Sequence, residues 1–365
     1  MGNKVGAAIG TIPSFSIIVL AVGLMNHVMV IPPLLQDAKR DAWLSVLAVI
    51  PPYMIWTTIL YFIMKKTNQQ PFLPWLQKNY GKMISAAFRT CFAIYLLTIC
   101  IMTAKDTTMW THASYLPRTP QVVIAASLVF LCCFAVQSGL RSIAIASGFL
   151  LPFVVIFGDF VMSANLPAKN YSLLTPIFEN GLDPVLRGSM YVGGGLVELI
   201  IILLFQHQLK SKIRLWSLWL LAIFLVVLVF GPVTGAIAEF GPFEAAKLRY
   251  PAYEEWRLVR VGKYIRHVDF LSIYQWLSGA FARISISLLL LVDLLPATHK
   301  RNFRLAWLYI LGIIVIVLVE LPFSDMQYFA FLKRVYLPLS LGAVTGVLFL
   351  LFLAVLIKKN KVGQQ

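Results

Sequence analysis

Charged residues are scarce in this sequence. Only 13% of its 365 residues are Asp, Glu, Lys or Arg, whereas 59% are hydrophobic. Soluble domains contain about 25% charged residues, so the composition excludes a soluble globular protein and indicates a chain that crosses a membrane repeatedly. Acidic residues number 15 against 31 Lys and Arg. Because the basic residues lie in short loops between apolar runs, this excess indicates membrane topology rather than nucleic-acid binding.

Cysteine is also rare, and no pattern typical of an enzyme or a metal site occurs. The four cysteines lie within apolar runs without metal-ligand spacing, so we expect reduced packing residues; they are Cys91, Cys100, Cys132 and Cys133. There is no His/Cys cluster, no Ser/His/Asp order and no phosphate-binding loop. The sequence therefore indicates neither an enzyme nor a protein with a metal or another cofactor.

Apolar runs of about twenty residues, long enough to cross a bilayer, occur ten times. We expect membrane spans at 12–34, 42–63, 83–104, 121–138, 142–164, 186–209, 215–237, 268–295, 304–322 and 335–357. A short interfacial helix is expected at 70–80, and a polar loop at 165–188. The sequence thus predicts an all-α polytopic membrane protein whose residues 1–365 form a single membrane domain.

The distribution of Lys and Arg predicts the orientation. If both termini are cytoplasmic, the inner loops carry about twice as many Lys and Arg as the short outer loops. The long loop at 239–267 is then extracytoplasmic, and its mixed charges do not overturn the assignment, because long loops cross with less regard to charge. The first apolar run contains Asn26 and His27 and lacks a cleavage site, so we expect a retained helix rather than a signal peptide.

Two spans carry glycine-bearing interruptions near their midpoints. Span 6 contains the consecutive glycines Gly193, Gly194 and Gly195, and span 1 contains Gly23 in Gly-Leu-Met-Asn-His. Glycine inside a helix costs about 1 kcal/mol relative to alanine, so both spans are expected to unwind there. Broken helices five spans apart are typical of an inverted-repeat transporter fold with its site at the midplane. We therefore expect two five-helix repeats, at 12–164 and 186–357.

Few ionisable groups lie deep in these spans. Glu198 follows the glycines, and it either faces a ligand or ion or caps backbone N–H groups freed by unwinding. Arg283 lies too deep in span 8 to reach the interface and needs a counter-charge, for which Glu198 is the candidate. Such a pair would either bind a substrate carboxylate or hold the helices together.

Other polar and aromatic residues have weaker functional interpretations. Asn26 could cap a half-helix at the break of span 1, where freed N–H groups could bind an anionic ligand group. His27 could titrate there, or could be a structural residue. Tyr95, Tyr191 and Trp276 could line a pocket or simply pack. Positions near the membrane interface are expected for Arg89, Asp159, Asp293 and Glu320.

Three blocks of sequence resemble the B subunits of bacterial spore germinant receptors, which belong to the amino acid–polyamine–organocation transporter superfamily. The blocks are Arg40–Leu44, Phe240–Val259 and Gly262–Gly279. The resemblance implies a ten-helix, leucine-transporter-like fold in the spore inner membrane. It also implies binding of a small nutrient, typically an amino acid, at the breaks of helices 1 and 6. Germination would be triggered, through ion release, together with an A subunit and a lipoprotein C subunit.

In that family the ligand pocket is lined by helices 1, 3, 6 and 8. Carried onto this sequence, the ligand-binding candidates are Gly23, Leu24, Asn26, Tyr95, Ile99, Gly193, Gly194, Gly195, Glu198, Gly279 and Arg283. Two other functions use the same fold. A secondary transporter would move an amino acid with H⁺ or Na⁺, and a scaffold subunit with a vestigial pocket would hold partners through the 239–267 loop.

Overall fold

The computed structural model describes residues 8–260, 267–296 and 300–357. Residues 261–266 of the predicted outer loop and the basic tail after Ile357 lie outside the described residues. The described residues are helical with no strand, apart from an isolated bridge between Ile9 and Leu209. An all-α architecture is thus confirmed.

The helices follow one another with short connections. In chain order the α-helices are α1 (Thr11–Leu24), α2 (Ile31–Ala38), α3 (Ala42–Ala48), α4 (Ile50–Lys66), α5 (Phe72–Tyr80), α6 (Lys82–Ser114), α7 (Gln121–Ser138), α8 (Leu140–Asn165), α9 (Leu182–Leu196), α10 (Ile202–Phe205), α11 (Leu215–Phe240), α12 (Pro242–Ala245), α13 (Pro251–Leu258), α14 (Leu271–Leu294), α15 (Arg301–Val319), α16 (Asp325–Phe331) and α17 (Leu337–Ile357). Two π-helical turns are η1 (Met25–Met29) and η7 (Leu332–Tyr336). The 3₁₀ helices are η2 (Lys39–Asp41), η3 (Leu166–Ala168), η4 (Tyr171–Leu174), η5 (Val197–Ile201) and η6 (Gln206–Gln208).

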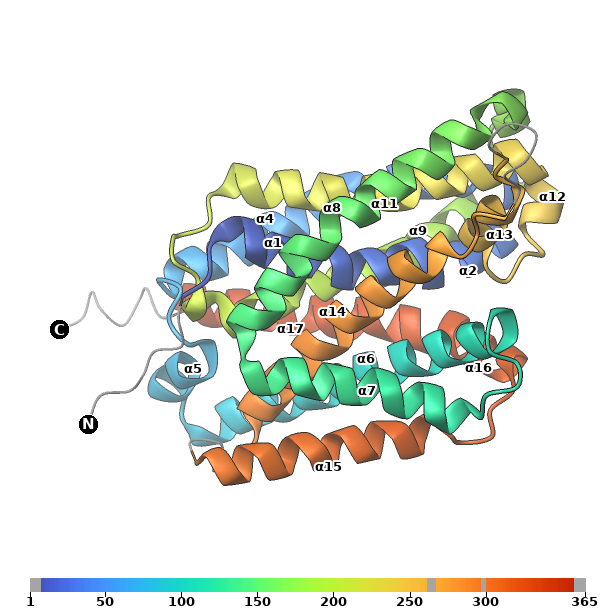
Figure 1. Ribbon diagram of the computed structural model, residues 1–365. Coiled ribbons are helices and arrows are strands. Elements are labelled where there is room, and N and C mark those ends of the chain that lie inside the picture. Colours follow the sequence, from blue (N-terminus) through green and yellow to red (C-terminus); the bar gives the residue numbers. More distant parts are fainter. Residues whose placement is uncertain (1–7, 261–266, 297–299, 358–365) are drawn as a thin grey trace.

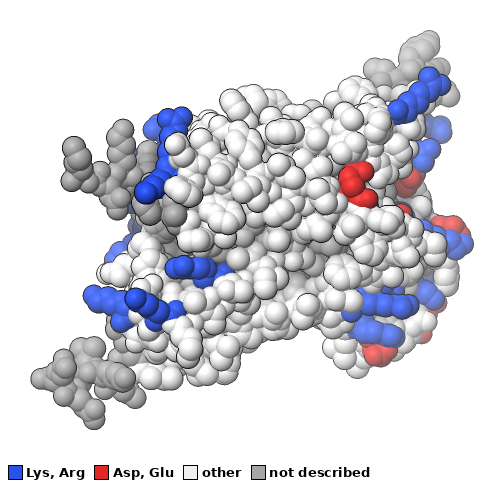
Figure 2. All heavy atoms as spheres, turned by 90° about the horizontal axis from the view of Figure 1, so that it is seen from below, with Lys and Arg blue, Asp and Glu red and all other residues white. Residues whose placement is uncertain are grey.

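Nine helical segments of the described chain are long and apolar enough to cross a membrane. The first, Thr11–Lys66, has 56 residues and reverses direction at η2, so it makes two crossings and the total is ten, as predicted. The start of α1 and the end of α17 lie at the same end of the bundle (Figure 1). Figure 2 shows charged side chains gathered at the two ends and an uncharged band between them. The protein is a multi-pass membrane protein.

The core of the bundle is built from three of the nine helical segments. The α1–α4 segment, the α9–α10 segment and α14 are almost entirely buried in their most apolar windows, whereas α8 is the least buried of the spans. α14 packs against α1, α6, α7 and α8, and α9 packs against α2, α3 and α17. The central helices are apolar on all sides because they are surrounded by protein. Five crossings precede the 166–181 connection and five follow it; their repeat symmetry stays a prediction.

Helices 1 and 6 depart from α-helical geometry, but not by the unwinding expected at their glycines. Helix 1 passes from α1 into the π-helical turn η1, and helix 6 passes from α9 into the 3₁₀ helix η5. The three consecutive glycines remain in the last turn of α9. They allow close packing instead: a Cβ at Gly194 would collide with the backbone of Leu337, and a Cβ at Gly195 with the amide of Asn26.

α6 extends ten residues beyond the predicted end of span 3. The prediction stopped at Ala104 because Lys105 and Asp106 end the apolar run, yet both side chains are buried. Lys105 Nζ donates hydrogen bonds to the carbonyl oxygens of Val319 (2.7 Å) and Leu321 (3.1 Å), which supplies a cation at the C-terminus of α15. The helix predicted at 70–80 is confirmed as α5, and its interfacial position stays a prediction.

Candidate ligand site at the irregular turns of helices 1 and 6

The two deep charges predicted to meet do meet. Glu198 comes from η5 and Arg283 from the middle of α14. Arg283 Nε lies 3.1 Å from Glu198 Oε2, and Nη2 contacts Oε1 of the same carboxylate. The two side chains are only 1% and 2% exposed. Such a buried two-point pair is rigid, and the loss of either partner leaves an uncompensated charge.

Uncharged side chains complete this ion pair. Arg283 Nη1 donates to Thr103 Oγ1 of α6 at 2.7 Å, and Nη2 donates to the hydroxyl oxygen of Tyr336 in η7 at 3.3 Å. The Tyr336 hydroxyl in turn donates to Glu198 Oε1 at 3.0 Å. Neither Thr103 nor Tyr336 could be predicted from the sequence, since an uncharged residue in an apolar run resembles any packing residue. The network therefore joins four spans at one point.

The carbonyl groups around the irregular part of helix 6 are satisfied by side chains. Ser340 of α17 donates to the Gly194 carbonyl oxygen at 3.1 Å, and the hydroxyls of Tyr95 and Ser340 are 3.2 Å apart. Tyr53 donates to the carbonyl oxygen of Leu196 at 3.1 Å. Because a buried carbonyl without a partner is costly, these hydroxyls stabilise the change from α-helix to 3₁₀ helix inside the bilayer.

Asn26, unlike the residues of the ion-pair network, has no such partners among the described residues. It lies in η1, and its side chain is fully buried beside Gly195. Among the described residues, neither its Nδ2 nor its Oδ1 has a hydrogen-bond partner. An unsatisfied buried donor or acceptor costs about 1–3 kcal/mol, so a fully unpaired amide needs an explanation. A polar molecule bound between the irregular turns of helices 1 and 6 would provide one.

The predicted ligand residues fall into two groups. The first group comes from the middle of helices 1, 3, 6 and 8, and its members are Asn26, Tyr95, Ile99, Gly193, Gly194, Gly195, Glu198 and Arg283. Gly23, Leu24 and Gly279 instead line a cavity on the side of α1 that faces α8 and α11. A Cβ at Gly279 would lie 2.8 Å from Leu24 Cβ, so this glycine lets α14 and α1 pack closely. That any of them binds a ligand stays a prediction.

Most of the other ionisable candidates lie at the surface. Arg89, Asp159 and Glu320 are exposed, as expected for interfacial positions. Asp293 pairs with Arg304 at 3.0 Å, and each side chain is 38% exposed. His27 lies in η1, where its Nδ1 is 3.2 Å from the carbonyl oxygen of Leu228 in α11. His27 also lines a cavity beside α1, so both interpretations of this residue stay predictions.

A second ionic network closes the end of the bundle that carries α12 and α13. Arg249 reaches Asp106 of α6 at 2.8 Å and Asp325 at the start of α16 at 3.1 Å. Burial alone would lower the pKa of Arg249, but its two carboxylate partners raise that pKa above its ordinary value. The network ties the predicted outer loop to spans 3 and 10. Sequence reasoning missed it, because the three residues are far apart in the chain.

Comparisons with known proteins agree with this architecture. Residues 10–328 match the family model described as spore germination protein. The chain belongs to the spore germination protein family. Its relatives include spore germination protein XB of Bacillus anthracis, which is 42% identical over 94% of this chain and 97% of the relative. The putative spore germination protein YfkT of Bacillus subtilis (strain 168) is 28% identical over 77% of each chain.

A solved structure shows the same fold. The crystal structure of MhsT in complex with L-phenylalanine superposes with a TM-score of 0.60, covering 94% of this chain and 97% of that chain at 13% identity. The leucine-transporter-like fold and the resemblance to germinant-receptor B subunits are thus confirmed. Family and fold together indicate a germination-related or transporter-like role for this chain rather than an enzymatic one.

Proposed function

We propose that this protein is the nutrient-sensing subunit of a spore germinant receptor and binds an amino acid between the irregular turns of helices 1 and 6. The observation that carries the proposal is the buried, unpaired amide of Asn26, which offers both a donor and an acceptor. It lies beside Gly195, three residues before Glu198. An amino acid brings opposite charges that match Glu198 and Arg283.

The ion pair suggests how binding becomes a signal. Without ligand, Arg283 and Glu198 satisfy each other, together with Thr103 and Tyr336. A ligand carboxylate competes for Arg283 and a ligand ammonium competes for Glu198, so binding favours a second arrangement of helices 1, 3, 6, 8 and 10. Differential affinity for two arrangements shifts their populations. The change would pass to the A and C subunits in the spore inner membrane, with both termini on the core side.

The experiment is a binding screen of the purified full chain in lipid nanodiscs against isotope-labelled amino acids, repeated with Asn26→Leu. We expect saturable binding that falls at least tenfold in Asn26→Leu, because the variant removes both polar contacts at nearly constant volume. Ser147→Ala is the matched control, since Ser147 Oγ is likewise buried and unpaired in the described chain but lies in α8. Equal affinity in Asn26→Leu, or no binding of any amino acid, would contradict the proposal.

A secondary amino acid transporter is the second candidate, and the structural match to MhsT favours it. The two functions share a fold and a site and differ only in net flux. Uptake of the bound amino acid into proteoliposomes under a proton or sodium gradient would establish transport, whereas binding without uptake would support the receptor.

A further inference from the structure

A crevice separate from the central ion pair opens on the side of the bundle. Its volume is about 270 Å³, and it lies between α8 and α11, with α1 and α14 beneath and α13 at one end. Met162 of α8 and Val227 of α11 line it and are 51% and 54% exposed. Both helices cross the membrane, so the mouth of the crevice faces the apolar layer of the bilayer. Leu20 and Leu24, which also line it, are buried.

The end of the crevice at α13 contains a buried charge cluster. Lys169 Nζ lies 3.2 Å from Glu255 Oε2 and 3.9 Å from Glu239 Oε2. The side chains of Lys169, Glu239 and Glu255 are 2%, 2% and 7% exposed. Two carboxylates against one ammonium leave one surplus negative charge when all three groups are ionised. Burial of an uncompensated charge is strongly unfavourable, so the cluster requires a further cation or a proton.

Unpaired oxygens show where a cation would bind. Among the described residues, Glu255 Oε1 and both carboxylate oxygens of Glu239 have no hydrogen-bond partner. Glu255 and Lys169 both line the crevice. A primary ammonium has three N–H donors for these three acceptors. Burial and the neighbouring Glu239 carboxylate raise the pKa of Glu255 to about 7, although Lys169 opposes the shift, so one ammonium does not offset the burial of two carboxylates.

The remaining lining determines what is attached to the cation. Beyond the cluster most of the lining is aliphatic or aromatic, including Trp256 and Trp276, and the polar side chains there are Asp159, His27, Gln275, Ser272 and Tyr253. A zwitterionic amino acid would bring its carboxylate next to Glu239 and Glu255 and be repelled. We propose that this crevice binds an amphiphilic cation, with a primary ammonium at Glu239 and Glu255 and an apolar chain between α8 and α11. The proposal goes beyond the nutrient site at Asn26 and does not depend on it.

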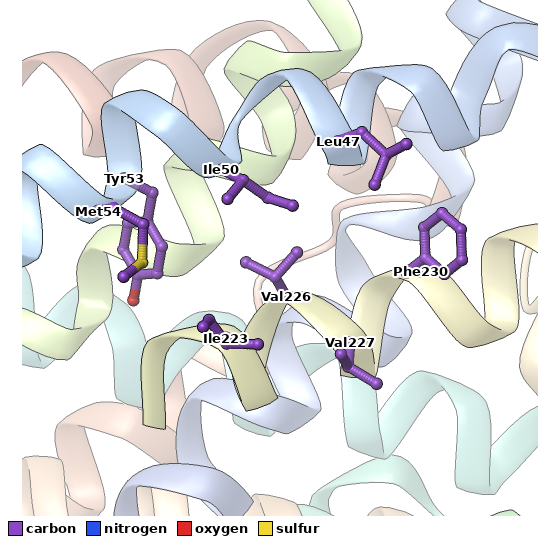
Figure 3. A pocket seen from close by; sticks show the side chains of 8 residues that line it. All are labelled: Leu47, Ile50, Tyr53, Met54, Ile223, Val226, Val227 and Phe230. Carbon is purple, nitrogen blue, oxygen red and sulfur yellow. The ribbon is translucent and has the colours of Figure 1, made fainter. Parts of the chain in front are cut away.

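A neighbouring groove provides an internal control. A second cavity, of about 140 Å³, lies between α11 and the α3–α4 segment and shares Val227 with the crevice (Figure 3). Figure 3 shows that the one polar atom among its lining side chains is the hydroxyl of Tyr53, and that hydroxyl already donates to Leu196. This groove has the apolar walls of the crevice without its charge cluster. An amphiphilic cation should therefore prefer the crevice.

The test is a titration of the full chain in nanodiscs with n-hexylammonium, using n-hexanol as the uncharged analogue. Tryptophan fluorescence reports binding, because Trp256 and Trp276 line the crevice. We expect saturable binding of hexylammonium at least tenfold tighter than that of hexanol, because hydrogen bonds between charged groups are stronger than those made by a neutral hydroxyl. Affinity should rise about fourfold for each methylene from butyl to hexyl. Equal affinity for hexanol and hexylammonium would overturn the proposal.

Three variants locate the site. Glu255→Gln should weaken hexylammonium binding at least tenfold and leave hexanol binding unchanged. Gly158→Leu should abolish binding of both probes, because Gly158 lines the crevice and a leucine side chain there would fill it. The variant should still fold, because a Cβ at this position meets only Gln275 Nε2, at 3.6 Å, and leucine favours the helix. Ile223→Trp fills the groove of Figure 3 and should change neither affinity. Unchanged hexylammonium affinity in either crevice variant, with a folded protein, would overturn the proposal.

Discussion

The central ion pair and the lateral crevice use buried charge in opposite ways. At the centre, Glu198 and Arg283 neutralise each other, and Thr103 and Tyr336 satisfy the remaining hydrogen bonds. In the crevice, Glu239 and Glu255 share one Lys169 and keep unpaired oxygens. The first arrangement is complete in itself and holds helices together. The second is incomplete, and it becomes satisfied only with a proton or a cation.

The two regions should differ most in how the free energy of unfolding changes when one carboxylate loses its charge. Glu198→Gln leaves Arg283 buried without its counter-charge, and we expect a loss of about 3–5 kcal/mol in the free energy of unfolding. Glu239→Gln removes a surplus charge, so stability should stay the same or rise. Thermal unfolding of the purified variants measures both. If Glu239→Gln were as destabilising as Glu198→Gln, the contrast between the regions would fail.

The double variant Glu198→Gln/Arg283→Met sharpens the first result. Removing both charges together leaves no uncompensated ion, so the double variant should recover most of the stability lost in Glu198→Gln. If the double variant lost as much stability as Glu198→Gln and Arg283→Met lose in sum, the two residues would not act as a unit.

The next largest effect is a dependence of stability on pH at the crevice. The pKa of Glu255 in the folded protein is about 7, above the ordinary value of 4.5. Between these values the folded state binds more protons than the unfolded state, so stability falls as pH rises from 4.5 to 7, by about 3 kcal/mol at most. Lys169 and Glu239 are the charged groups that face Glu255. Unfolding followed from pH 5 to 8 should show this decline in the wild type and a flatter profile in Glu255→Gln.

A smaller effect is expected where the two regions adjoin. A Cβ at Gly279 would lie 2.8 Å from Leu24 Cβ and 3.2 Å from the carbonyl oxygen of Leu20. Gly279→Ala should therefore push α14 from α1 and lower stability by about 1–3 kcal/mol. Gly342→Ala in α17 is the control, because nothing lies within 4 Å of its Cβ. A Gly279→Ala protein as stable as Gly342→Ala would mean that the α1–α14 contact tolerates a methyl group.

The smallest effect concerns a half-exposed ion pair. Asp293 and Arg304 are 3.0 Å apart, and each side chain is 38% exposed. Asp293→Asn should change the free energy of unfolding by less than about 1 kcal/mol, because water already solvates both charges. If Asp293→Asn lowered the unfolding temperature as much as Glu198→Gln does, burial of the charges would not determine how much stability is lost.

The sequence was sufficient to predict what depends on long apolar runs and rare charges. Ten spans followed from run length, and the Glu198–Arg283 pair followed because two deep charges need each other. The sequence alone could not predict how the glycines of helix 6 act, because glycine permits both unwinding and close packing. The backbone of Leu337, which packs against Gly194, decides between the two. Nor could the sequence predict the crevice cluster. Lys169 and Glu255 are 86 residues apart in polar connections, where charges are ordinary.

Amide hydrogen exchange tests the two-site account most directly. The full chain in nanodiscs would be compared without ligand, with each amino acid of the binding screen, and with n-hexylammonium. A bound amino acid should protect η1 and η5, whereas hexylammonium should protect α13 and leave η5 unchanged. Amino-acid protection confined to α13, or no change at η1 and η5 with any amino acid, would contradict a nutrient site at Asn26.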